Sequence, residues 1–360
     1  MPKSNSALTE TNQRSSNNHR SSEIPFDNQS MGQDASSASS PLQSQDLQKL
    51  MILINQEIQQ YLQEDKGEPQ ILYEAAHHLI IAGGKRLRSL LTLLCCQAVN
   101  GDTEKVLPIT VATELLQTAS LIHDDIIDDD EMRRGVQTVH RKFGKDLAIL
   151  AGDLLIAQAF RIVGLHGTKE LIVHLGSGGI RMCEGEAADL SMSVDKTSSF
   201  NKQEYISMIK RKTVAFMKYA AKIGAIMGGA TEDQQQALMR YAEMLGFAFQ
   251  LRDDILDVKA TLLTAQKSIL SDLRLQRGNY PVIHTLEVCS KQDHHRCTQA
   301  FAEGNLKVVL EVLDETDAIQ HTHEMAQIYV KEAKQGLQGH GFHSLKLLEQ
   351  FADFVLEREF

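Results

Sequence analysis

Acidic side chains gather in two short segments of the chain at the same spacing. The segment from 121 to 135 reads LIHDDIIDDDEMRRG, and the segment from 247 to 257 reads FAFQLRDDILD. Each contains the pattern D-D-x-x-D after an apolar run. On a helix the first and last aspartates of such a pattern lie about 40° apart, so their carboxylates share one face. The six aspartates are Asp124, Asp125, Asp128, Asp253, Asp254 and Asp257.

These two clusters predict a site for divalent cations. One acidic cluster by itself is most simply a solvated helical face. Two copies that each follow apolar sequence favour the rim of a core or cavity, where crowded carboxylates repel one another unless a cation compensates them. Carboxylate oxygens suit Mg²⁺, which keeps several waters and takes oxygens from a substrate phosphate. We therefore expect Mg²⁺ that holds a diphosphate, whereas the D-x-D-x-D-G spacing of a calcium loop is missing.

Basic residues accompany the first acidic cluster. The segment GGKRLRS, from 83 to 89, places Lys85 and Arg88 after two glycines, and Arg133 and Arg134 follow the acidic run directly. Alone, each pair would be an ordinary solvated surface. Beside two candidate metal clusters, these residues are predicted to hold anionic oxygens, because the arginine fork orients a phosphate as well as attracting it.

Helices are predicted to position all of these side chains. No proline lies between Pro108 and Pro281, so a long stretch has no obligatory helix breaker. Apolar residues recur at helical spacing between Phe216 and Met227, and sustained strand-like alternation is hard to find. We expect an all-α fold. Turns between its helices are predicted at the glycine-containing segments 83–84, 100–102, 176–179, 228–229 and 278–279.

Composition and charge narrow the class of protein. The net charge of −10 argues against binding to nucleic acid. Five cysteines without C-x-x-C spacing favour reduced thiols over a zinc ribbon or a disulfide framework. We expect no membrane span and a cytoplasmic protein, because the apolar runs are short and no secretory signal is visible. An organellar presequence is a weaker alternative, suggested by the serine-rich start with Arg14 and Arg20.

Two regions are expected along the chain. Residues 1–45 are rich in Ser, Asn and Gln and are predicted to be a disordered polar tail. Residues 46–360 show no linker or short internal repeat and are predicted to form a single all-α catalytic domain.

The order of the motifs resembles that of the polyprenyl synthetase family, the trans-isoprenyl diphosphate synthases. The resemblance covers roughly residues 47 to 360 and rests on HLIIAGGKRLRSLL, LIHDDIIDDDEMRRG, FGKDLAILAGDLL, KRKTVAF, GFAFQLRDDILD and KSILSDL. It implies an isoprenoid synthase-type helical bundle around a deep central cavity, and a homodimer. It also implies a prenyltransferase that condenses isopentenyl diphosphate head-to-tail with an allylic diphosphate, such as farnesyl or geranylgeranyl diphosphate, by ionisation, condensation and elimination.

The resemblance implies a role for each matched position. The six aspartates would bind Mg²⁺, about three ions in all, held through oxygen ligands. Positions matched to the allylic diphosphate are Arg133, Lys212 and Lys267. Positions matched to the diphosphate of isopentenyl diphosphate are His78, Lys85, Arg88 and Arg134. Polar positions near the reacting carbons are Thr213 and Gln250.

Small residues before the first cluster indicate a long product. In the family, bulky aromatic side chains four and five residues before the first aspartate stop chain growth early. Here these positions are Ser120 and Ala119, and Leu116 lies about one helical turn further back. We expect a medium- to long-chain product, beyond farnesyl length, with Leu116 as a partial floor. The alternative is that the small residues only allow close helix packing.

Two positions depart from the family pattern, and three other functions remain open. Ser89 stands where the family usually has proline, and the segment 276–281 replaces Gly-Lys-x-Thr-Leu-Pro, with Arg277 keeping the charge. One alternative is a metal phosphohydrolase that uses the His123-Asp124 pair with His77 or His78. The others are a terpene cyclase and a non-catalytic regulatory subunit of a heteromeric prenyl synthase.

Overall fold

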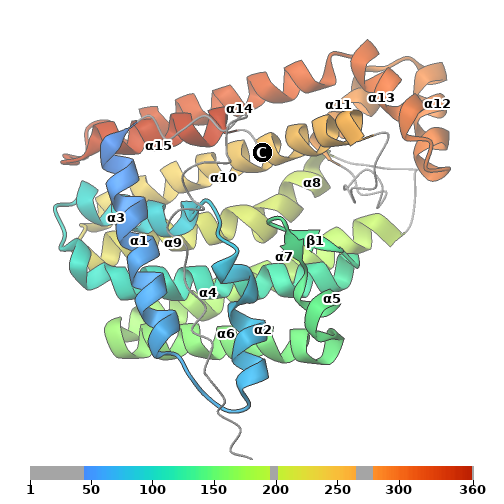
Figure 1. The fold of residues 1–360 in the computed structure, drawn as a ribbon. Helices are drawn as coiled ribbons and strands as arrows, with labels where there is room; N and C mark the ends of the chain where they lie inside the picture. Colours follow the sequence, from blue (N-terminus) through green and yellow to red (C-terminus); the bar gives the residue numbers. More distant parts are fainter. Residues whose placement is uncertain (1–43, 195–201, 265–278, 359–360) are drawn as a thin grey trace, which may run out of the picture. The chain divides into compact units, whose positions relative to one another are not determined.

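The computed structural model describes residues 44–194, 202–264 and 279–358. These residues form helices and one short hairpin within a single compact unit, so the all-α prediction is confirmed (Figure 1). Of the predicted tail, only Ser44 and Gln45 are described, and Gln45 begins the first helix. Lys267 and the segment around Arg277 lie outside the described residues.

The first half of the described chain contains seven helices and the hairpin. They are α1 (Gln45–Glu64), α2 (Gln70–Ile81), α3 (Leu87–Ala98), α4 (Thr103–Asp128), β1 (Met132–Arg133), β2 (Val136–Gln137), α5 (Val139–Phe143), α6 (Lys145–His166) and α7 (Lys169–Val194). The second half continues with α8 (Lys202–Ile209), a π-helix (Lys210–Val214), α9 (Ala215–Met227), α10 (Glu232–Thr264), α11 (Tyr280–Val288), α12 (Lys291–Ala302), α13 (Leu306–Glu315), α14 (Ala318–Gln335) and α15 (Leu345–Glu357).

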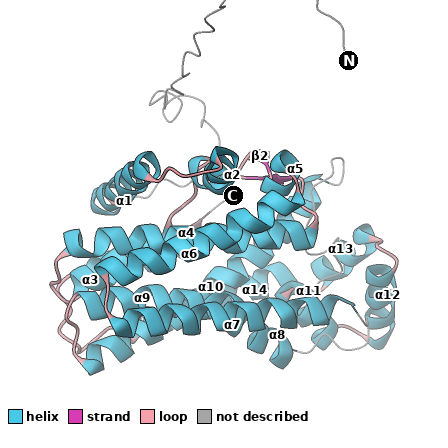
Figure 2. Cartoon of the chain, turned by 90° about the horizontal axis from the view of Figure 1, so that it is seen from below, coloured by secondary structure: helices cyan, strands magenta, loops and turns pink. Residues whose placement is uncertain are grey.

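The long helices pack along one another. α4 lies along α6, α3 contacts both α4 and α9, and α10 packs between α9 and α14. In Figure 2 the pair α4 and α6 lies on one side, with α9, α10 and α14 on the other. α1 and α2 cross the long helices steeply (Figure 1). The two helices that carry the acidic clusters, α4 and α10, therefore belong to different parts of one bundle.

α4 ends where the first acidic cluster ends. Its amino terminus is capped by Asp102, whose side chain accepts a hydrogen bond from the Glu104 amide at 3.1 Å. Its last helical residue is Asp128, and Asp129 adopts a left-handed conformation with φ 56°. The negative end of the helix dipole thus coincides with several carboxylates, an unfavourable arrangement that a cation relieves.

Most of the predicted turns are confirmed, but one is wrong. The segments 83–84, 100–102 and 228–229 separate consecutive helices, whereas 176–179 lies inside α7. Two glycines of α7 lie against neighbouring elements. Gly178 lies against the ring of Tyr219, and a Cβ atom at Gly185 would come within 2.3 Å of the Lys212 amide nitrogen. Small residues there let α7 approach the π-helix.

One helix of the described residues, α6, is long and apolar enough to cross a membrane by length and composition alone, a property that core helices also have. It packs against α4, α2 and α5, and 44% of its most apolar window is buried. Together with α7, it also exposes large apolar side chains that the described helices do not cover. We call these the α6–α7 face. They are Ile149, Leu150, Phe160, Leu165, Ile172, Val173 and Ile180, between 36% and 68% exposed.

Candidate active site

The first acidic cluster is tied to the hairpin that follows it. Asp125 is fully buried and accepts a hydrogen bond from Nε of Arg133. Arg133 also reaches Asp130, with Nη2 and Oδ2 2.9 Å apart. The strands β1 and β2 pair antiparallel and turn the chain back toward α4. Arg133, predicted from the sequence to bind an anion, is therefore held in a fixed orientation by Asp125.

This cluster carries more negative charge than its protein neighbours compensate. Burial and the nearby Glu186 raise the pKa of Asp124 to about 7, against the opposing effects of Lys212 and Arg133. Burial raises the pKa of Asp125 to about 6 although Arg133 lowers it. Oδ2 of Asp125 and Oε1 of Glu186 are buried without a hydrogen-bond partner among the described residues. These orphaned carboxylate oxygens fit a divalent cation.

Lys212 lies opposite the first cluster, on the π-helix. Its Nζ is 2.5 Å from Oδ2 of Asp189 and 2.7 Å from Oε2 of Glu186, both on α7. These acids and Asp124 raise the pKa of Lys212 well above its usual range, so the ammonium stays charged. Glu186 and Asp189 were not predicted from the sequence as site residues. Their spacing of three residues on one helix was the available signal.

A chain of hydrogen bonds joins the π-helix to the second cluster on α10. The Thr213 hydroxyl donates to Oε1 of Gln250 at 2.7 Å, and Nε2 of Gln250 donates to Oδ1 of Asp254 at 3.0 Å. Oδ2 of Asp254 accepts from the Tyr205 hydroxyl at 2.6 Å and from the Tyr280 amide at 2.8 Å. Asp254 is 2% exposed. Both of its oxygens therefore accept hydrogen bonds from protein donors, and Asp254 fixes the orientation of Gln250.

Asp253 faces a residue near the carboxyl end of the chain. It accepts a hydrogen bond from Nη2 of Arg358, a contact that no sequence motif predicted. The Arg358 guanidinium lies 3.7 Å from the centre of the Phe249 ring, and the same Nη2 donates to the Phe249 carbonyl at 2.9 Å. The chain end thereby brings a cation to the second acidic cluster.

Lys85 and Arg88 lie beside this ion pair. Burial lowers the pKa of Arg88 to about 10, with Glu114 and Asp253 acting in the opposite direction. Burial and Arg358 lower the pKa of Lys85. The Arg88 guanidinium lies 4.9 Å from the centre of the Phe216 ring, and its Nε is buried without a hydrogen-bond partner among the described residues. Three crowded cations with an unused donor fit a multivalent anion.

A buried network supports the segment that carries Lys85 and Arg88. Arg86, with φ 46°, pairs with Glu114 at 3.1 Å, and both side chains are 4% exposed. The Ser89 hydroxyl lies 2.8 Å from Oε1 of Glu114 and 3.0 Å from the Thr110 carbonyl. Ser89 thus adds a contact to α4 that a proline at this position lacks.

Arg134 and His78 are held by backbone carbonyls. Nη1 of Arg134 donates to the Leu79 carbonyl at 2.7 Å, and burial with Arg86 nearby lowers its pKa to about 10. Nε2 of His78 lies 2.8 Å from the Gln137 carbonyl, and burial lowers the pKa of its imidazole. Both residues connect α2 to the hairpin, near the segment after α2 that carries Lys85 and Arg88.

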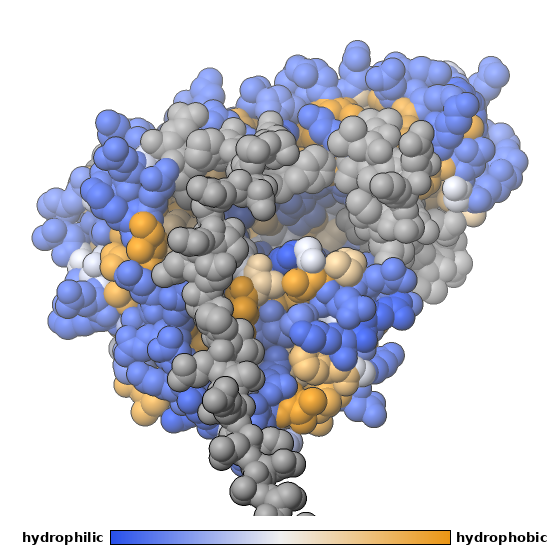
Figure 3. Space-filling view, viewed as in Figure 1, coloured by the Kyte–Doolittle hydropathy of each residue, from blue (hydrophilic) through white to orange (hydrophobic). Residues whose placement is uncertain are grey.

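The predicted residues therefore surround one region between α4 and α10. Asp124 interacts with Lys212, and the next residue, Thr213, is hydrogen-bonded through Gln250 to Asp254 of the second cluster. Figure 3 shows a hollow near the centre of the view, with hydrophilic residues in its depth. No ready-made cluster of three or more metal-ligating side chains occurs among the described residues. Several carboxylates are instead paired with cations of the protein.

The predicted chain-length residues lie behind the first cluster on α4. Ala119 is 1% exposed and belongs to the main core. Ser120 is half-buried, with its hydroxyl bonded to the Gln117 carbonyl at 2.9 Å, and Leu116 is half-buried against the core. Ser120 and Leu116 lie one and two turns before Asp124, as expected for a wall below the acidic cluster.

The histidines of the phosphohydrolase alternative do not converge. Nε2 of His77 pairs with Asp65 at 2.9 Å, and His78 bonds to the hairpin. His123 turns toward α6, where its Nε2 lies 3.4 Å from the Ile149 carbonyl. The structure thus gives these three side chains separate partners.

Known proteins are similar in sequence to most of this chain. The sequence model of the polyprenyl synthetase family matches residues 69–315. A short chain isoprenyl diphosphate synthase of Methanothermobacter thermautotrophicus is 38% identical over 299 residues, 81% of this chain and 91% of that protein. A geranylgeranyl diphosphate synthase of Methanosarcina mazei is 35% identical over 303 residues, with the same two shares.

Two solved structures have the same fold. Geranylgeranyl pyrophosphate synthetase of Pyrococcus horikoshii superposes with a TM-score of 0.77 at 33% identity, covering 87% of this chain and 98% of that chain. A polyprenyl synthase of Caulobacter crescentus, complexed with calcium and isoprenyl diphosphate, gives a TM-score of 0.77 at 28% identity, covering 86% and 95%. The fold is thus that of the isoprenoid synthases.

Proposed function

The chain belongs to the polyprenyl synthetase family and is a trans-prenyl diphosphate synthase, and we propose that it condenses isopentenyl diphosphate head-to-tail with an allylic diphosphate in a Mg²⁺-dependent reaction. The observation that carries this proposal is the path of contacts between the two acidic clusters. Asp124 interacts with Lys212, and the adjacent Thr213 bonds to Gln250, which bonds to Asp254. Acidic and basic groups of α4, α10 and the π-helix thereby surround one reaction space.

The proposed Mg²⁺ ligands are Asp124, Asp125 and Asp128 on α4, and Asp253, Asp254 and Asp257 on α10. Their oxygens include Oδ2 of Asp125, which has no hydrogen-bond partner among the described residues. When bound, Mg²⁺ neutralises the diphosphate and stabilises it as a leaving group. Asp125 and Asp254 also orient neighbouring side chains. Asp125 holds Arg133, and Asp254 holds Gln250, so the neighbours of the substrate keep fixed orientations. The number of ions, about three, follows from the family resemblance.

The cationic side chains form two groups in this proposal, one for the diphosphate of each substrate. Arg133 and Lys212 lie at the first cluster and hold the oxygens of the allylic diphosphate. Their positive charges stabilise the negative charge that the diphosphate gains when its bond to the allylic carbon breaks. Lys85, Arg88 and Arg358 lie together near Asp253 and hold isopentenyl diphosphate.

The reacting carbons meet between these two anion sites. The isopentenyl double bond attacks the allylic cation, forming the new carbon–carbon bond, and loss of a proton to the departing diphosphate restores an alkene. The Thr213–Gln250 pair lies between the two acidic clusters and supplies fixed polar atoms there, and burial around it keeps water from the cation.

We propose a product longer than farnesyl diphosphate, of geranylgeranyl length or more. The small side chains of Ala119 and Ser120 leave the wall below Asp124 without a bulky group. Leu116, one turn further down, is the first large side chain on that wall and would limit growth. Two similar proteins, the geranylgeranyl diphosphate synthase of Methanosarcina mazei and the geranylgeranyl pyrophosphate synthetase of Pyrococcus horikoshii, support this range.

We also propose a homodimer that covers the α6–α7 face. Val173 and Ile180, one face of α7 at a spacing of seven residues, are 59% and 61% exposed, and Leu165 is 68% exposed. Exposed large apolar side chains on two neighbouring helices favour an association site. A second copy would bury it at a symmetric interface between like helices. In this proposal α6 faces a protein partner rather than lipid, and the chain does not span a membrane.

The proposed location is the cytoplasm. Cys95, Cys96 and Cys297 are buried free thiols, and Cys183 and Cys289 are free as well. Reduced thiols are typical of proteins in reducing compartments.

Activity of the purified chain alone tests the proposed function. The protein is incubated with Mg²⁺, labelled isopentenyl diphosphate and either farnesyl or geranylgeranyl diphosphate, and the dephosphorylated products are sized. Elongated products that vanish with EDTA and in an Asp124→Asn variant are expected. A folded chain that makes no product alone but activates a second synthase would instead identify a regulatory subunit, and cyclic hydrocarbon would identify a cyclase.

A further inference from the structure

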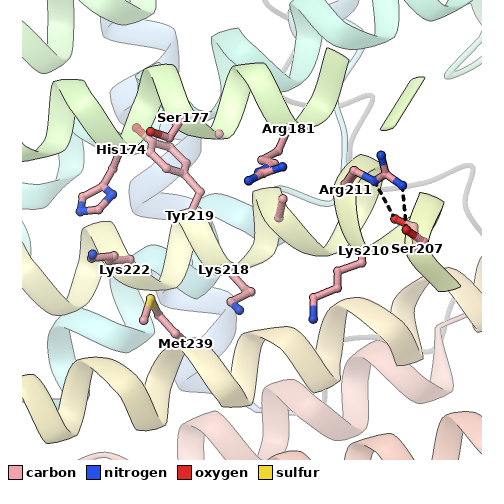
Figure 4. Close-up of a pocket in the computed structure, with 12 residues that line it drawn as sticks. His174, Ser177, Arg181, Ser207, Lys210, Arg211, Lys218, Tyr219, Lys222 and Met239 are labelled. Atoms are coloured by element: carbon pink, nitrogen blue, oxygen red, sulfur yellow. Dashed lines mark hydrogen bonds between the residues drawn. The ribbon is translucent and has the colours of Figure 1, made fainter. Parts of the chain in front are cut away.

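A second, basic groove lies between α7, α9 and α10. Its volume is about 540 Å³. α7 contributes from one side, the π-helix and α9 from the middle, and α10 from the other side (Figure 4). Among the described residues that line it, none is acidic, although the whole chain has a net charge of −10. The cationic or titratable lining residues of this basic groove are His174, Arg181, Lys210, Arg211, Lys218 and Lys222.

Neighbouring carboxylates compensate only part of this charge. Glu243 on α10 pairs with both Lys210, at 3.0 Å, and Lys218, at 2.7 Å, so one carboxylate serves two ammonium groups. Arg181 pairs with Glu184 at 2.8 Å, one helical turn away. Lys222 has no ion-pair partner among the described residues. The basic groove therefore keeps excess positive charge that an anion would neutralise.

A buried hydroxyl in the wall of the groove also lacks a partner. Tyr219 is 6% exposed, and its hydroxyl oxygen is buried without a hydrogen-bond partner among the described residues. The ring reaches from α9 to α7, where it lies against Gly178 (Figure 4). Burial raises the pKa of this phenol, so the hydroxyl keeps its proton and can donate. An unused buried donor beside a cluster of cations points to an acceptor that is absent from the protein itself.

The basic groove is separate from the aspartate site. None of the six aspartates lines it. The π-helix marks the division, because Lys210 and Arg211 line the groove while the next residue, Lys212, pairs with Glu186 and Asp189. A π-helix often occurs at functional sites, since its wider turn changes the direction of neighbouring side chains.

The groove also lies on a different side of α7 from the proposed dimer contact. His174 and Arg181 line the groove, whereas Val173 and Ile180 belong to the α6–α7 face. Adjacent helical positions point roughly 100° apart. A second copy bound to the α6–α7 face would therefore leave the basic groove accessible to a ligand.

We propose that the basic groove binds a diphosphate group, either as free inorganic diphosphate or at the head of an isoprenoid. Several cations around a concave site select a small multivalent anion. The volume exceeds what a diphosphate alone requires, and Ala215, Tyr219 and Met239 add apolar lining for an attached chain. The choice of these two ligands rests on the proposed function, because both are products of that reaction. The binding of an anion in the groove does not depend on the proposed function.

Binding in the groove would act on the catalytic residues through the π-helix. Lys210 and Arg211 contact the ligand, and Lys212 and Thr213 follow them directly in the same π-helix. Arg211 is at present held by Ser207, through Nη2 to the hydroxyl at 2.7 Å (Figure 4). A diphosphate that draws Arg211 away from Ser207 would shift the element that orients Lys212.

Calorimetric titration with inorganic diphosphate in EDTA tests the proposal. All proteins carry Lys85→Ala and Arg88→Ala, which weaken the anion site of isopentenyl diphosphate, and EDTA removes metal from the aspartate site. The groove variant adds Lys218→Gln and Lys222→Gln. Its matched control adds Lys49→Gln and Lys105→Gln, two exposed lysines on α1 and α4 with the same change in net charge. A third protein adds Tyr219→Phe, which removes only the hydroxyl.

The parent and the control are expected to bind diphosphate. The groove variant should bind it with an affinity at least about tenfold lower, because charge-assisted hydrogen bonds are lost. Tyr219→Phe should weaken binding several-fold while the protein remains folded. Equal affinity of the folded groove variant and the control would overturn the proposal, whatever the catalytic assay shows. Tighter binding of geranylgeranyl diphosphate than of inorganic diphosphate would identify the isoprenoid as the source, and equal binding would identify free diphosphate.

Discussion

The Ser89 hydroxyl donates to Oε1 of Glu114 at 2.8 Å, and this hydrogen bond connects the start of α3 to the middle of α4. The same Glu114 pairs with Arg86, next to Lys85. The orientation of the segment that carries Lys85 and Arg88 therefore depends on a buried network outside the reaction space. The departure from the family at Ser89 strengthens this connection between α3 and α4.

Replacing Ser89 with alanine should destabilise the protein by about 1–2 kcal/mol, because Glu114 loses a donor in a buried site. Chemical denaturation measures the change. Ser191→Ala, at an exposed serine that bonds to the Ala188 carbonyl, is the matched control and should change stability by no more than roughly 0.5 kcal/mol. Equal effects of the two substitutions would show that the buried bond contributes nothing.

Removal of Arg358 should weaken the binding of isopentenyl diphosphate. Arg358→Ala takes one cation from the group that includes Lys85 and Arg88, and loss of a charge-assisted hydrogen bond should raise the KM for this substrate roughly tenfold or more. Steady-state kinetics at saturating allylic diphosphate measure it. Arg240→Ala, an exposed arginine of α10, should leave the KM unchanged. A KM in Arg358→Ala equal to that of the control would place Arg358 outside the anion site.

Bulky side chains below the first cluster should shorten the product. Ser120→Phe adds a ring at a half-buried position and should stop growth earlier, as chromatography of the dephosphorylated products would reveal. Ala119→Phe should act in the same direction but cost about 1–3 kcal/mol of stability, because Ala119 lies in the packed core. Both variants are compared at equal folded concentration. An unchanged product from Ser120→Phe combined with Ala119→Phe would rule out this wall as the limit.

Without metal, the protein should lose stability as the pH rises. Burial raises the pKa of Asp124 to about 7 and that of Asp125 to about 6 in the folded state. The unfolded chain has lower pKa values at these positions and releases its protons first. Folding is therefore increasingly penalised as the pH passes from the unfolded to the folded pKa values, and the Tm in EDTA should be lower at pH 8 than at pH 5.

An Asp124→Asn variant is the control for this pH dependence, since it lacks one of the two titrating groups. Its Tm should fall less between pH 5 and pH 8. Mg²⁺ added at pH 8 should raise the Tm of the unmodified protein more than that of the variant, because the ion binds only the folded state. Parallel pH profiles for the two proteins would contradict the raised pKa of Asp124.

Charges on the α6–α7 face should dissociate the dimer. Val173→Lys with Ile180→Lys places two ammonium groups where a second copy would bury apolar surface, whereas in the monomer both positions are already more than half exposed. Sedimentation velocity should show a monomer. Val288→Lys with Ile328→Lys, at exposed apolar positions on α11 and α14, should leave the sedimentation coefficient unchanged. A dimer that survives the first pair of substitutions would place the interface elsewhere.

Local sequence determined the helices and the location of the chemistry. The absence of proline between Pro108 and Pro281 and the recurrence of apolar residues predicted long helices, because both act over one or two turns. The D-D-x-x-D spacing predicted carboxylates on one face of α4 and of α10 for the same reason. The glycines from 176 to 179 misled the turn prediction, because the helix α7 continues through them; of the three, only Gly178 lies against a neighbouring helix, at the ring of Tyr219.

The tertiary structure alone decided which side chains meet. Arg358 reaches Asp253 across 105 residues of sequence, and Tyr205 reaches Asp254 across 49, so no local pattern could pair them. Aspartates of the two D-D-x-x-D clusters have different neighbours. Asp254 accepts hydrogen bonds from Tyr205 and Tyr280, whereas burial and the nearby Glu186 raise the pKa of Asp124. Residue type fixes what a group can bind, but its protonation and orientation depend on burial and on neighbours that only folding brings near.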